Sequence, residues 1–524
     1  MPDTAISIHK SFIQGPTTSI PSTTRLPSFV MWEDLENLIK SQNQTTKPCE
    51  VADVLAYLGS PSTSIAILDH GKISSRCYST DKSHDTETVY QACSISKPIA
   101  GLAAMRLVDL GQLDLNKPIS EYLPARVLQI IGTPETAHLV SCITPKQLMS
   151  HTSGLTVHGV PGYLNSSPDL ETILSGRAPS GMLHVHLSDF PGHRFSYSGG
   201  GMTVLQLLLQ QITSKTFPDL MRDLVFEPLG MTRSHYHSPG ANFAAAHYTG
   251  YQPYEFTHRT YPEYAAAGLW TTPTDLLKAA LALQKSLNGG PSTFLTQSTA
   301  RLMLTAVQDS MALTMMAPAS GTTFRHAGSN IGYRCDLVAF ADLRALHSGK
   351  STMSDSQGRN TELDSSTDES QEMDIPEYSG ICIMTNSDAG AAVYEKIQLA
   401  ILYLKNWPAF PTDAYYVSKA VVPFIDYDAR IGSEWRSWIG AWGYLELSDD
   451  GGNMPLLIFH GQPGGLNIPL RPAARPKAVG GAIDFVARGL EIMIRLTEKD
   501  GERVVELWHG VSDDIRTLHR SAAS

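Results

Sequence analysis

Residues 94–97 read Ser-Ile-Ser-Lys and stand directly before an apolar run, residues 98–105, whose composition predicts a buried helix. Side chains three positions apart share one face of a helix, so Ser94 and Lys97 can touch, whereas Ser96 is adjacent to Lys97 and points away from it. The partial positive charge of a helix N-terminus favours an oxyanion there. The pattern predicts an activated serine nucleophile, but Ser-x-x-Lys also occurs by chance in ordinary helix starts, so this interpretation depends on further segments.

Two further segments can complete such a site. Tyr197 precedes an apolar helical run, residues 202–212, and is either a core aromatic residue or a proton relay. Residues 325–333 carry His326 and Gly328 and run into a strand-like segment at 335–340. A glycine on an edge strand lets a substrate backbone lie close to the protein. By contrast, the polar turn around His151 indicates a structural role rather than a chemical one.

Together these motifs resemble the serine β-lactamase and penicillin-binding-protein superfamily. Ser94-x-x-Lys97, Tyr197-Ser198-Gly199 and His326-Ala327-Gly328 occur in that superfamily's order and approximate spacing. The similarity is closest to the branch of class C β-lactamases, esterases and D-aminopeptidases. Residues 151–155, 227–231, 267–272 and 384–387 also resemble recurring segments of that branch. The resemblance spans roughly residues 45–425 and implies an α/β (α+β) fold, with an antiparallel sheet flanked by helices and an all-helical subdomain.

The resemblance also implies a chemistry. Ser94 would attack an ester or amide, with Lys97 or Tyr197 as the base; which of the two takes the proton stays open. The backbone N–H groups of Ser94 and Ser329 would hold the oxyanion, and His326, Gly328, Ser329 and Gly199 would line the substrate site. The acyl group would then pass to water, or to an alcohol or amine.

Two positions depart from the superfamily's pattern. Gly199 stands where an asparagine often contacts the substrate, so that contact is lost or supplied elsewhere. His326 stands where a lysine frequently attracts a substrate carboxylate. A histidine is mostly neutral at pH 7, since its reference pKa is about 6.5. We therefore expect neither a true β-lactamase nor a carboxypeptidase, but a protein closer to the histidine variants among D-aminopeptidases and esterase-like members.

Composition excludes several other classes of function. The formal net charge of −11 over 524 residues argues against nucleic-acid partners and anionic membrane surfaces. No apolar run is long enough to span a bilayer, and the N-terminus lacks the apolar core of a signal peptide, so a cytoplasmic protein is expected. The six cysteines are scattered without metal-type pairs, which indicates buried free thiols. We expect neither a metal nor another cofactor.

The chain divides into three predicted regions. Residues 1–30 are rich in Ser, Thr and Pro and indicate a flexible arm. Residues 31–427 form the catalytic domain, with a helix at 32–41, a hairpin at 64–69 and 73–78, and later strands at 336–340 and 381–385. Within it, residues 347–377 are polar and acidic and predict a disordered insertion, with a lid over the site as the alternative. Residues 428–524 predict a small all-β, barrel-like domain that resembles the lipocalin-like C-terminal domains of some superfamily members.

The favoured function is therefore a serine hydrolase acting through an acyl-serine intermediate on an intracellular small molecule, in secondary-metabolite biosynthesis. An acyltransferase, transesterase or cyclase of the same fold is the first alternative. A catalytically silent binding or scaffold protein is the second, although the intact Ser94, Lys97 and Tyr197 weigh against it. Whether the chain forms a homo-oligomer stays open.

Overall fold

The computed structural model describes most of the chain up to residue 408 and the strands beyond it. The described residues are 28–40, 50–164, 167–250, 252–347, 375–408, 433–443, 445–449, 455–459, 466–472, 483–487, 492–499, 501–509 and 515–521. Almost all of the predicted arm at 1–30 and of the predicted insertion at 347–377 lies outside these ranges, as does the expected domain boundary near residue 427.

A five-stranded antiparallel sheet forms the centre of the first region, in the strand order β2-β1-β9-β8-β7. Its strands are β1 (Ser62–Asp69), β2 (Lys72–Ser79), β7 (Thr323–Asn330), β8 (Tyr333–Phe340) and β9 (Gly380–Thr385). The hairpin predicted at 64–78 and the later strands agree with this sheet. β7 is the last strand in this order and has only an isolated bridge, between Arg325 and Met316, on its other side. It is therefore an edge strand, and it carries the His326 segment.

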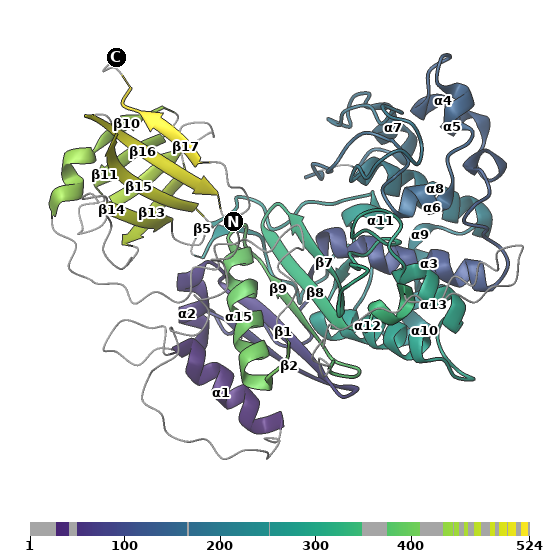
Figure 1. Cartoon of the computed structure of the whole chain (residues 1–524), viewed down its shortest axis with the longest axis horizontal. Helices are drawn as coiled ribbons and strands as arrows, with labels where there is room; N and C mark the ends of the chain where they lie inside the picture. The colour runs from purple at the N-terminus through teal and green to yellow at the C-terminus, as the bar shows by residue number, and fades with distance from the viewer. Residues whose placement is uncertain are drawn as a thin grey trace, which may run out of the picture.

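The two faces of the sheet are covered by different layers of helices (Figure 1). Successive side chains of a strand point to opposite faces, and in β1 the residues Ile65 and Ile67 pack on one side while Ala66 and Leu68 pack on the other. The first face is covered by α1 (Ser28–Lys40), α2 (Val51–Leu58) and α15 (Gly390–Lys405). The predicted helix at 32–41 is thus present, starting four residues earlier.

The opposite face and the region beyond it hold the remaining helices, and their apolar residues form the larger core. These helices are α3 (Ser96–Asp109), α4 (Ala125–Ile131), α5 (Ala137–Val140), α6 (Pro145–Met149), α7 (Leu170–Ser175), α8 (Gly199–Thr213), α9 (Phe217–Met221), α10 (Glu227–Leu229), α11 (Tyr264–Ala267), α12 (Pro273–Asn288), α13 (Gln297–Leu304) and α14 (Arg344–His347). Two short ladders join loops among them: β3 (Tyr90–Gln91) with β6 (Trp270–Thr271), and β4 (His247–Thr249) with β5 (Gln252–Pro253). The β3–β6 ladder lies immediately before the Ser94 turn.

The C-terminal region is an eight-stranded antiparallel sheet in sequential order. Its strands are β10 (Gly440–Trp442), β11 (Leu445–Asp449), β12 (Pro455–Phe459), β13 (Leu466–Pro472), β14 (Ile483–Ala487), β15 (Ile492–Lys499), β16 (Glu502–His509) and β17 (Ile515–His519). The first and last strands are joined by an isolated bridge between Trp442 and Arg520, and the described residues show no ladder that closes a barrel. The predicted all-β character is confirmed.

The apolar run at 438–445 does not form one continuous strand. A 3-10 turn (Ser433–Trp438) precedes β10, and the chain then turns before β11. The reason lies in two glycines, Gly440 and Gly443, whose φ angles are 134° and 58°. Both φ angles are positive, a region that glycine adopts without a steric penalty.

A buried ion pair joins the edge of the main sheet to α15, and its loss should destabilise the fold. Arg325 donates to Asp336 at 2.8 Å, Gln398 donates to the same carboxylate oxygen at 2.7 Å, and both charged residues are buried. We expect Asp336→Ala to lower the free energy of unfolding by about 3–5 kcal/mol, because it leaves the Arg325 guanidinium buried and unpaired. Chemical denaturation measures this. Asp342→Ala removes an exposed pair with Arg344 and serves as the control, with an expected loss below about 1 kcal/mol. Equal losses in the two variants would contradict the assignment.

Candidate active site

Ser94 lies in a strained turn at the start of the buried helix α3. The turn is a 3-10 turn (Cys93–Ile95) that continues into α3 at Ser96. Cys93 has a φ angle of 51°, a left-handed conformation that costs a residue other than glycine about 1–3 kcal/mol. The Lys97 Nζ atom lies 3.0 Å from the Ser94 Oγ atom. The three-residue spacing therefore produces the contact that it predicts.

The two neighbouring candidates for the nucleophile are engaged in structural contacts. The Ser96 hydroxyl donates to the Cys93 carbonyl at 2.6 Å and accepts from the Leu269 N–H at 3.1 Å, and its side chain is fully buried. The Cys93 thiol donates to the Gln91 carbonyl at 3.3 Å. Ser94, by contrast, is partly exposed and faces the Lys97 amine. The geometry favours Ser94 as the reactive hydroxyl.

Lys97 is a buried amine whose hydrogen-bond acceptors are both uncharged. Its Nζ atom donates to Ser94 Oγ and, at 2.8 Å, to the carbonyl of Ala266 in α11. Burial lowers the pKa of Lys97 from its ordinary 10.5 to about 7, because the charged form loses its hydration without gaining a carboxylate partner. A large fraction of the amine is therefore neutral at physiological pH. In that form it can take a proton from a serine hydroxyl.

Tyr197 lies over the same amine, with the Lys97 Nζ atom 4.9 Å from its ring centroid. Both neighbours of Tyr197 in the chain are fixed by a single residue, His151. The Ser196 N–H donates to the His151 carbonyl at 2.8 Å, and the Ser198 N–H donates to the His151 Nδ1 atom at 3.2 Å. Ser198 also caps α8 by accepting from the Gly201 N–H at 2.8 Å. The tyrosine is thus held by a helix start and by the turn around His151.

His151 is a polar neighbour of Tyr197 that the sequence did not predict. Its turn was interpreted as structural, and its ring packs against Tyr197 with 4.3 Å between centroids. The imidazole is fully buried, and burial, reinforced by the charge of Lys97, holds its pKa well below the usual value. Its Nδ1 atom accepts a hydrogen bond, so the ring is neutral with its proton on Nε2. His151 supports the backbone on both sides of Tyr197, and its ring beside Tyr197 is uncharged.

The loop at residues 157–158 occupies the place next to Gly199, where the superfamily often has an asparagine. The Gly199 N–H donates to the His158 carbonyl at 3.1 Å, and a Cβ atom at Gly199 would lie 3.0 Å from that oxygen. The His158 ring packs on Tyr197 with 4.7 Å between centroids and is exposed. Val157 holds the loop with a φ angle of 72°, which is a strained value for a β-branched residue. His158 is a second polar residue at the site that sequence reasoning missed.

The edge strand β7 lies against the Ser94 turn. A Cβ atom at Gly328 would lie 2.6 Å from the Ala92 carbonyl oxygen and 2.9 Å from the Cys93 Cβ atom, so only glycine permits this approach. Asn330, at the end of β7, donates to the Gln91 side chain at 2.7 Å and to the Ala267 carbonyl at 3.1 Å. Ser329, between these two residues, is exposed. Three of the predicted residues, His326, Gly328 and Ser329, therefore belong to the strand that borders the Ser94 turn.

His326 is buried and neutral. Its Nδ1–H donates to the Ala327 carbonyl at 2.6 Å. Burial and, second, the charge of Lys97 lower the pKa of His326 to about 3. Its ring centroid lies 6.3 Å from that of Tyr197. At physiological pH His326 therefore supplies no positive charge to the site.

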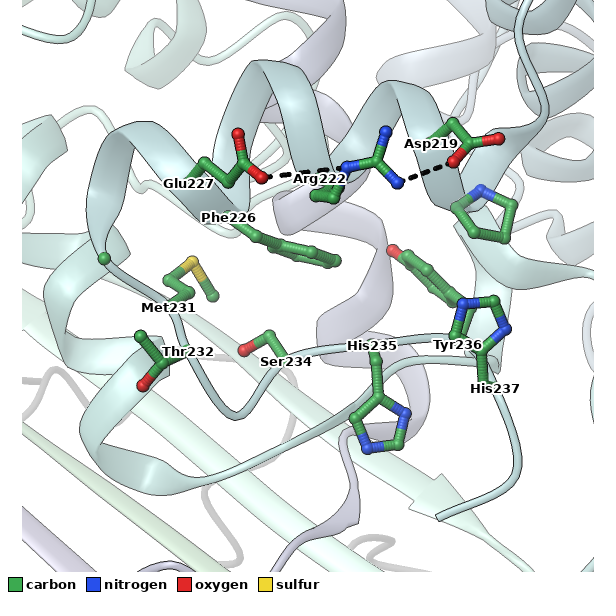
Figure 2. Close-up of a pocket in the computed structure, with 12 residues that line it drawn as sticks. Asp219, Arg222, Phe226, Glu227, Met231, Thr232, Ser234, His235, Tyr236 and His237 are labelled. Atoms are coloured by element: carbon green, nitrogen blue, oxygen red, sulfur yellow. Dashed lines mark hydrogen bonds and ion pairs between the residues drawn. The ribbon is translucent and has the colours of Figure 1, made fainter. Parts of the chain in front are cut away.

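A pocket of about 430 Å³ lies apart from these residues, on the segment that connects α9 to residue 237 (Figure 2). The charged side chains that line it form ion pairs with one another: Arg222 contacts Asp219 at 2.7 Å and Glu227 at 3.8 Å. Its floor includes Tyr236, whose ring lies 5.0 Å from that of Tyr264 in α11. The pocket lining contains none of the predicted site residues, so the Ser94 cluster remains the candidate active site.

Within the described ranges, no group of three or more histidine, cysteine, aspartate or glutamate side chains is arranged to hold a metal ion. None of the helices described there is long and apolar enough to cross a bilayer.

Comparison with known proteins agrees with this geometry. The family model described as Beta-lactamase matches residues 51–345, which is more than half of the chain. The chain belongs to the beta-lactamase family. Protein flp of Staphylococcus aureus (strain NCTC 8325 / PS 47) is 29% identical over 226 residues, covering 41% of this chain and 42% of that protein. Penicillin-binding protein 4 of Amycolatopsis lactamdurans is 27% identical over 149 residues, covering 28% and 36% respectively. The chain thus spans less than half the length of these curated relatives.

Solved structures support the beta-lactamase fold at low sequence identity. An octameric penicillin-binding protein homologue from Pyrococcus abyssi superposes with a TM-score of 0.51 and 17% identity, covering 93% of this chain and 99% of that one. The D-amino acid amidase from Ochrobactrum anthropi superposes with a TM-score of 0.50 and 16% identity, covering 71% and 99%. At these identities the likeness concerns the fold alone. It places the α+β arrangement of this chain among penicillin-binding-protein-like structures.

Because the 157–158 loop fills the space beside Gly199, an asparagine at position 199 should displace this loop and lower activity. In the ester hydrolysis proposed below, we expect Gly199→Asn to reduce kcat/KM for p-nitrophenyl butanoate by about ten- to hundredfold, since the new Cβ pushes the His158 carbonyl and shifts the loop against Tyr197. Gly159→Ala is the matched control, because a Cβ there would meet nothing within 4 Å. An increase in activity in Gly199→Asn would show that the loop does not replace the asparagine.

Proposed function

We propose that this beta-lactamase family member is a serine hydrolase that forms an acyl-serine intermediate on an ester or amide. The observation that carries the proposal is the 3.0 Å contact between the Ser94 hydroxyl and the buried Lys97 amine, whose pKa burial lowers to about 7. Family membership supports a hydrolase in general. The nature of the bond, the substrate and the roles of the individual residues are parts of this proposal.

In the proposed reaction the Ser94 oxygen attacks the substrate carbonyl carbon while its proton passes to the neutral Lys97 amine. The tetrahedral oxyanion is held by the backbone N–H groups of Ser94 and Ser329, which the closeness of β7 to the Ser94 turn allows. The intermediate collapses, and the leaving group takes the proton from Lys97, directly or through Tyr197. Water then adds to the acyl-serine and gives its proton to the same base. The base returns this proton to the Ser94 oxygen as the acyl–oxygen bond breaks, which releases the acid and free Ser94.

The same residues could pass the acyl group to an alcohol or amine, which is the acyltransferase, transesterase or cyclase alternative. Hydrolysis is the function proposed, because it requires no second binding site beyond the one described. We propose a small molecule as the substrate, with an intracellular setting and a step in secondary metabolism as the sequence-based expectation. The octameric state of the Pyrococcus abyssi homologue makes a homo-oligomer the assembly to test, by light scattering.

The direct test of the nucleophile is substitution of the two serines. Ser94→Ala should lower turnover of p-nitrophenyl butanoate by about a thousandfold or more, because the acyl acceptor is removed. Ser96→Ala should retain turnover, because the Ser96 hydroxyl is buried in structural hydrogen bonds. Stopped-flow or steady-state kinetics measure the turnover of both variants, and circular dichroism spectra check that both are folded. The reverse result would assign the nucleophile to Ser96, and undiminished turnover in both variants would move it to another residue. Absence of turnover in the unsubstituted protein would favour a catalytically silent protein.

The pH dependence of kcat/KM should report the deprotonation of Lys97. A base with a pKa of about 7 is active when deprotonated, so kcat/KM should rise with pH and level off above about pH 8. At pH 6 only about a tenth of such a base is neutral, and kcat/KM should be about tenfold below the plateau. Burial also raises the pKa of Glu263 to about 7. Glu263→Gln is therefore the control, and disappearance of the pH-dependent limb in that variant would contradict the assignment to Lys97.

A further inference from the structure

The charges around Ser94 restrict the substrates that the site can accept. Four basic side chains surround Tyr197: Lys97, His151, His158 and His326. Within the described part of the chain, none of the four has a carboxylate partner within 4.0 Å, and the groups that perturb their pKa values are one another, a thiol, an arginine and backbone groups. These four bases therefore have no paired carboxylate.

A substrate ammonium group would find no counter-charge here. Moving an ammonium ion out of water is unfavourable unless a carboxylate or several acceptors replace its hydration. The acid nearest in sequence to the Lys97 acceptor Ala266 is Glu263, and it is fully buried, so it does not present its carboxyl group to a bound substrate. Neither the four basic side chains around Tyr197 nor Glu263 thus compensates an amino group next to the scissile bond.

Neither the residues around Tyr197 nor strands β7 and β8 offer a permanent cation to a substrate carboxylate. His326, at the position where a lysine is frequent in the superfamily, is neutral at physiological pH. Arg325, its neighbour in β7, is buried and bound to Asp336 at 2.8 Å. Arg334 in β8 is paired with Asp388 at 2.9 Å. Lys97 itself must be neutral to act as the base, so it cannot also serve as a carboxylate anchor.

We propose that Ser94 accepts acyl groups that carry no charge within a few atoms of the scissile bond, and that the site discriminates against both cationic and anionic acyl groups. The proposal rests on the acyl-serine function above and narrows its substrate class to neutral esters and amides. It separates this chain from proteins that recognise a free amino group or a free carboxylate beside the bond they cleave.

Three p-nitrophenyl esters of nearly equal shape test this selectivity. The neutral ester is the 5,5-dimethylhexanoate, the cationic one is the 4-(trimethylammonio)butanoate, in which nitrogen replaces the quaternary carbon, and the anionic one is the 4-sulfobutanoate. At pH 8 and low ionic strength, kcat/KM for the neutral ester should exceed each of the other two by about tenfold or more, after correction for the rates of uncatalysed hydrolysis. A cationic or anionic ester that matches or exceeds the neutral one overturns the proposal.

A charge introduced beside Tyr197 should change the preference. His158 is exposed and packs on Tyr197, so His158→Glu places a carboxylate at the site, and His158→Gln is the uncharged control. The ratio of kcat/KM for the cationic ester to that for the neutral ester should rise by about tenfold in His158→Glu and stay unchanged in His158→Gln. An unchanged ratio in both variants would contradict the proposal that charge governs the selectivity.

Failure of the underlying function gives a different result. If Ser94 forms no acyl-serine and none of the three esters is turned over, the acyl-serine function is wrong and the substrate inference falls with it. If the esters are turned over with equal kcat/KM values, the acyl-serine function stands and only the substrate inference is overturned.

Discussion

The structure around Ser94 depends on the burial of one amine without a counter-charge. Lys97 is held by a hydroxyl and a backbone carbonyl, and burial lowers its pKa from 10.5 to about 7. Between these two pH values the unfolded chain binds the proton that the folded chain has lost, so this residue makes the fold more stable as pH rises through that range. The same burial makes the amine a base near neutral pH. Stability and chemistry are thus linked through one desolvated group.

The surrounding elements converge to keep that amine in place. Gln206 of α8 donates to the Pro262 carbonyl and accepts from the Ala265 N–H, which fixes α11 and its Ala266 carbonyl. Asn330 joins the end of β7 to the last residue of α11. The long separations in sequence between these partners mean that the site forms only when the sheet and the helical region have packed together.

Local patterns in the sequence predicted the parts of the fold that depend on nearby residues. The Ser94–Lys97 contact follows from helical spacing, and the hairpin of β1 and β2 follows from two strand-like runs joined by a short turn. The all-β character of the C-terminal region follows from its strand-like runs. The packing of His151 and His158 on Tyr197 could not be predicted in this way, because those residues are about forty positions from Tyr197 and only the folded chain brings them together. The segment around His151 was visible as a family motif, which was the available signal.

The most direct test of the account is to identify the residue that reacts with an uncharged organophosphate. Diethyl p-nitrophenyl phosphate transfers its phosphoryl group to an activated serine, and intact mass followed by peptide mapping locates the product. The account predicts one diethylphosphoryl group per chain, on Ser94, formed much more slowly in Lys97→Met because the base is lost. Modification of Ser96 or Cys93, or no modification at all, would contradict it.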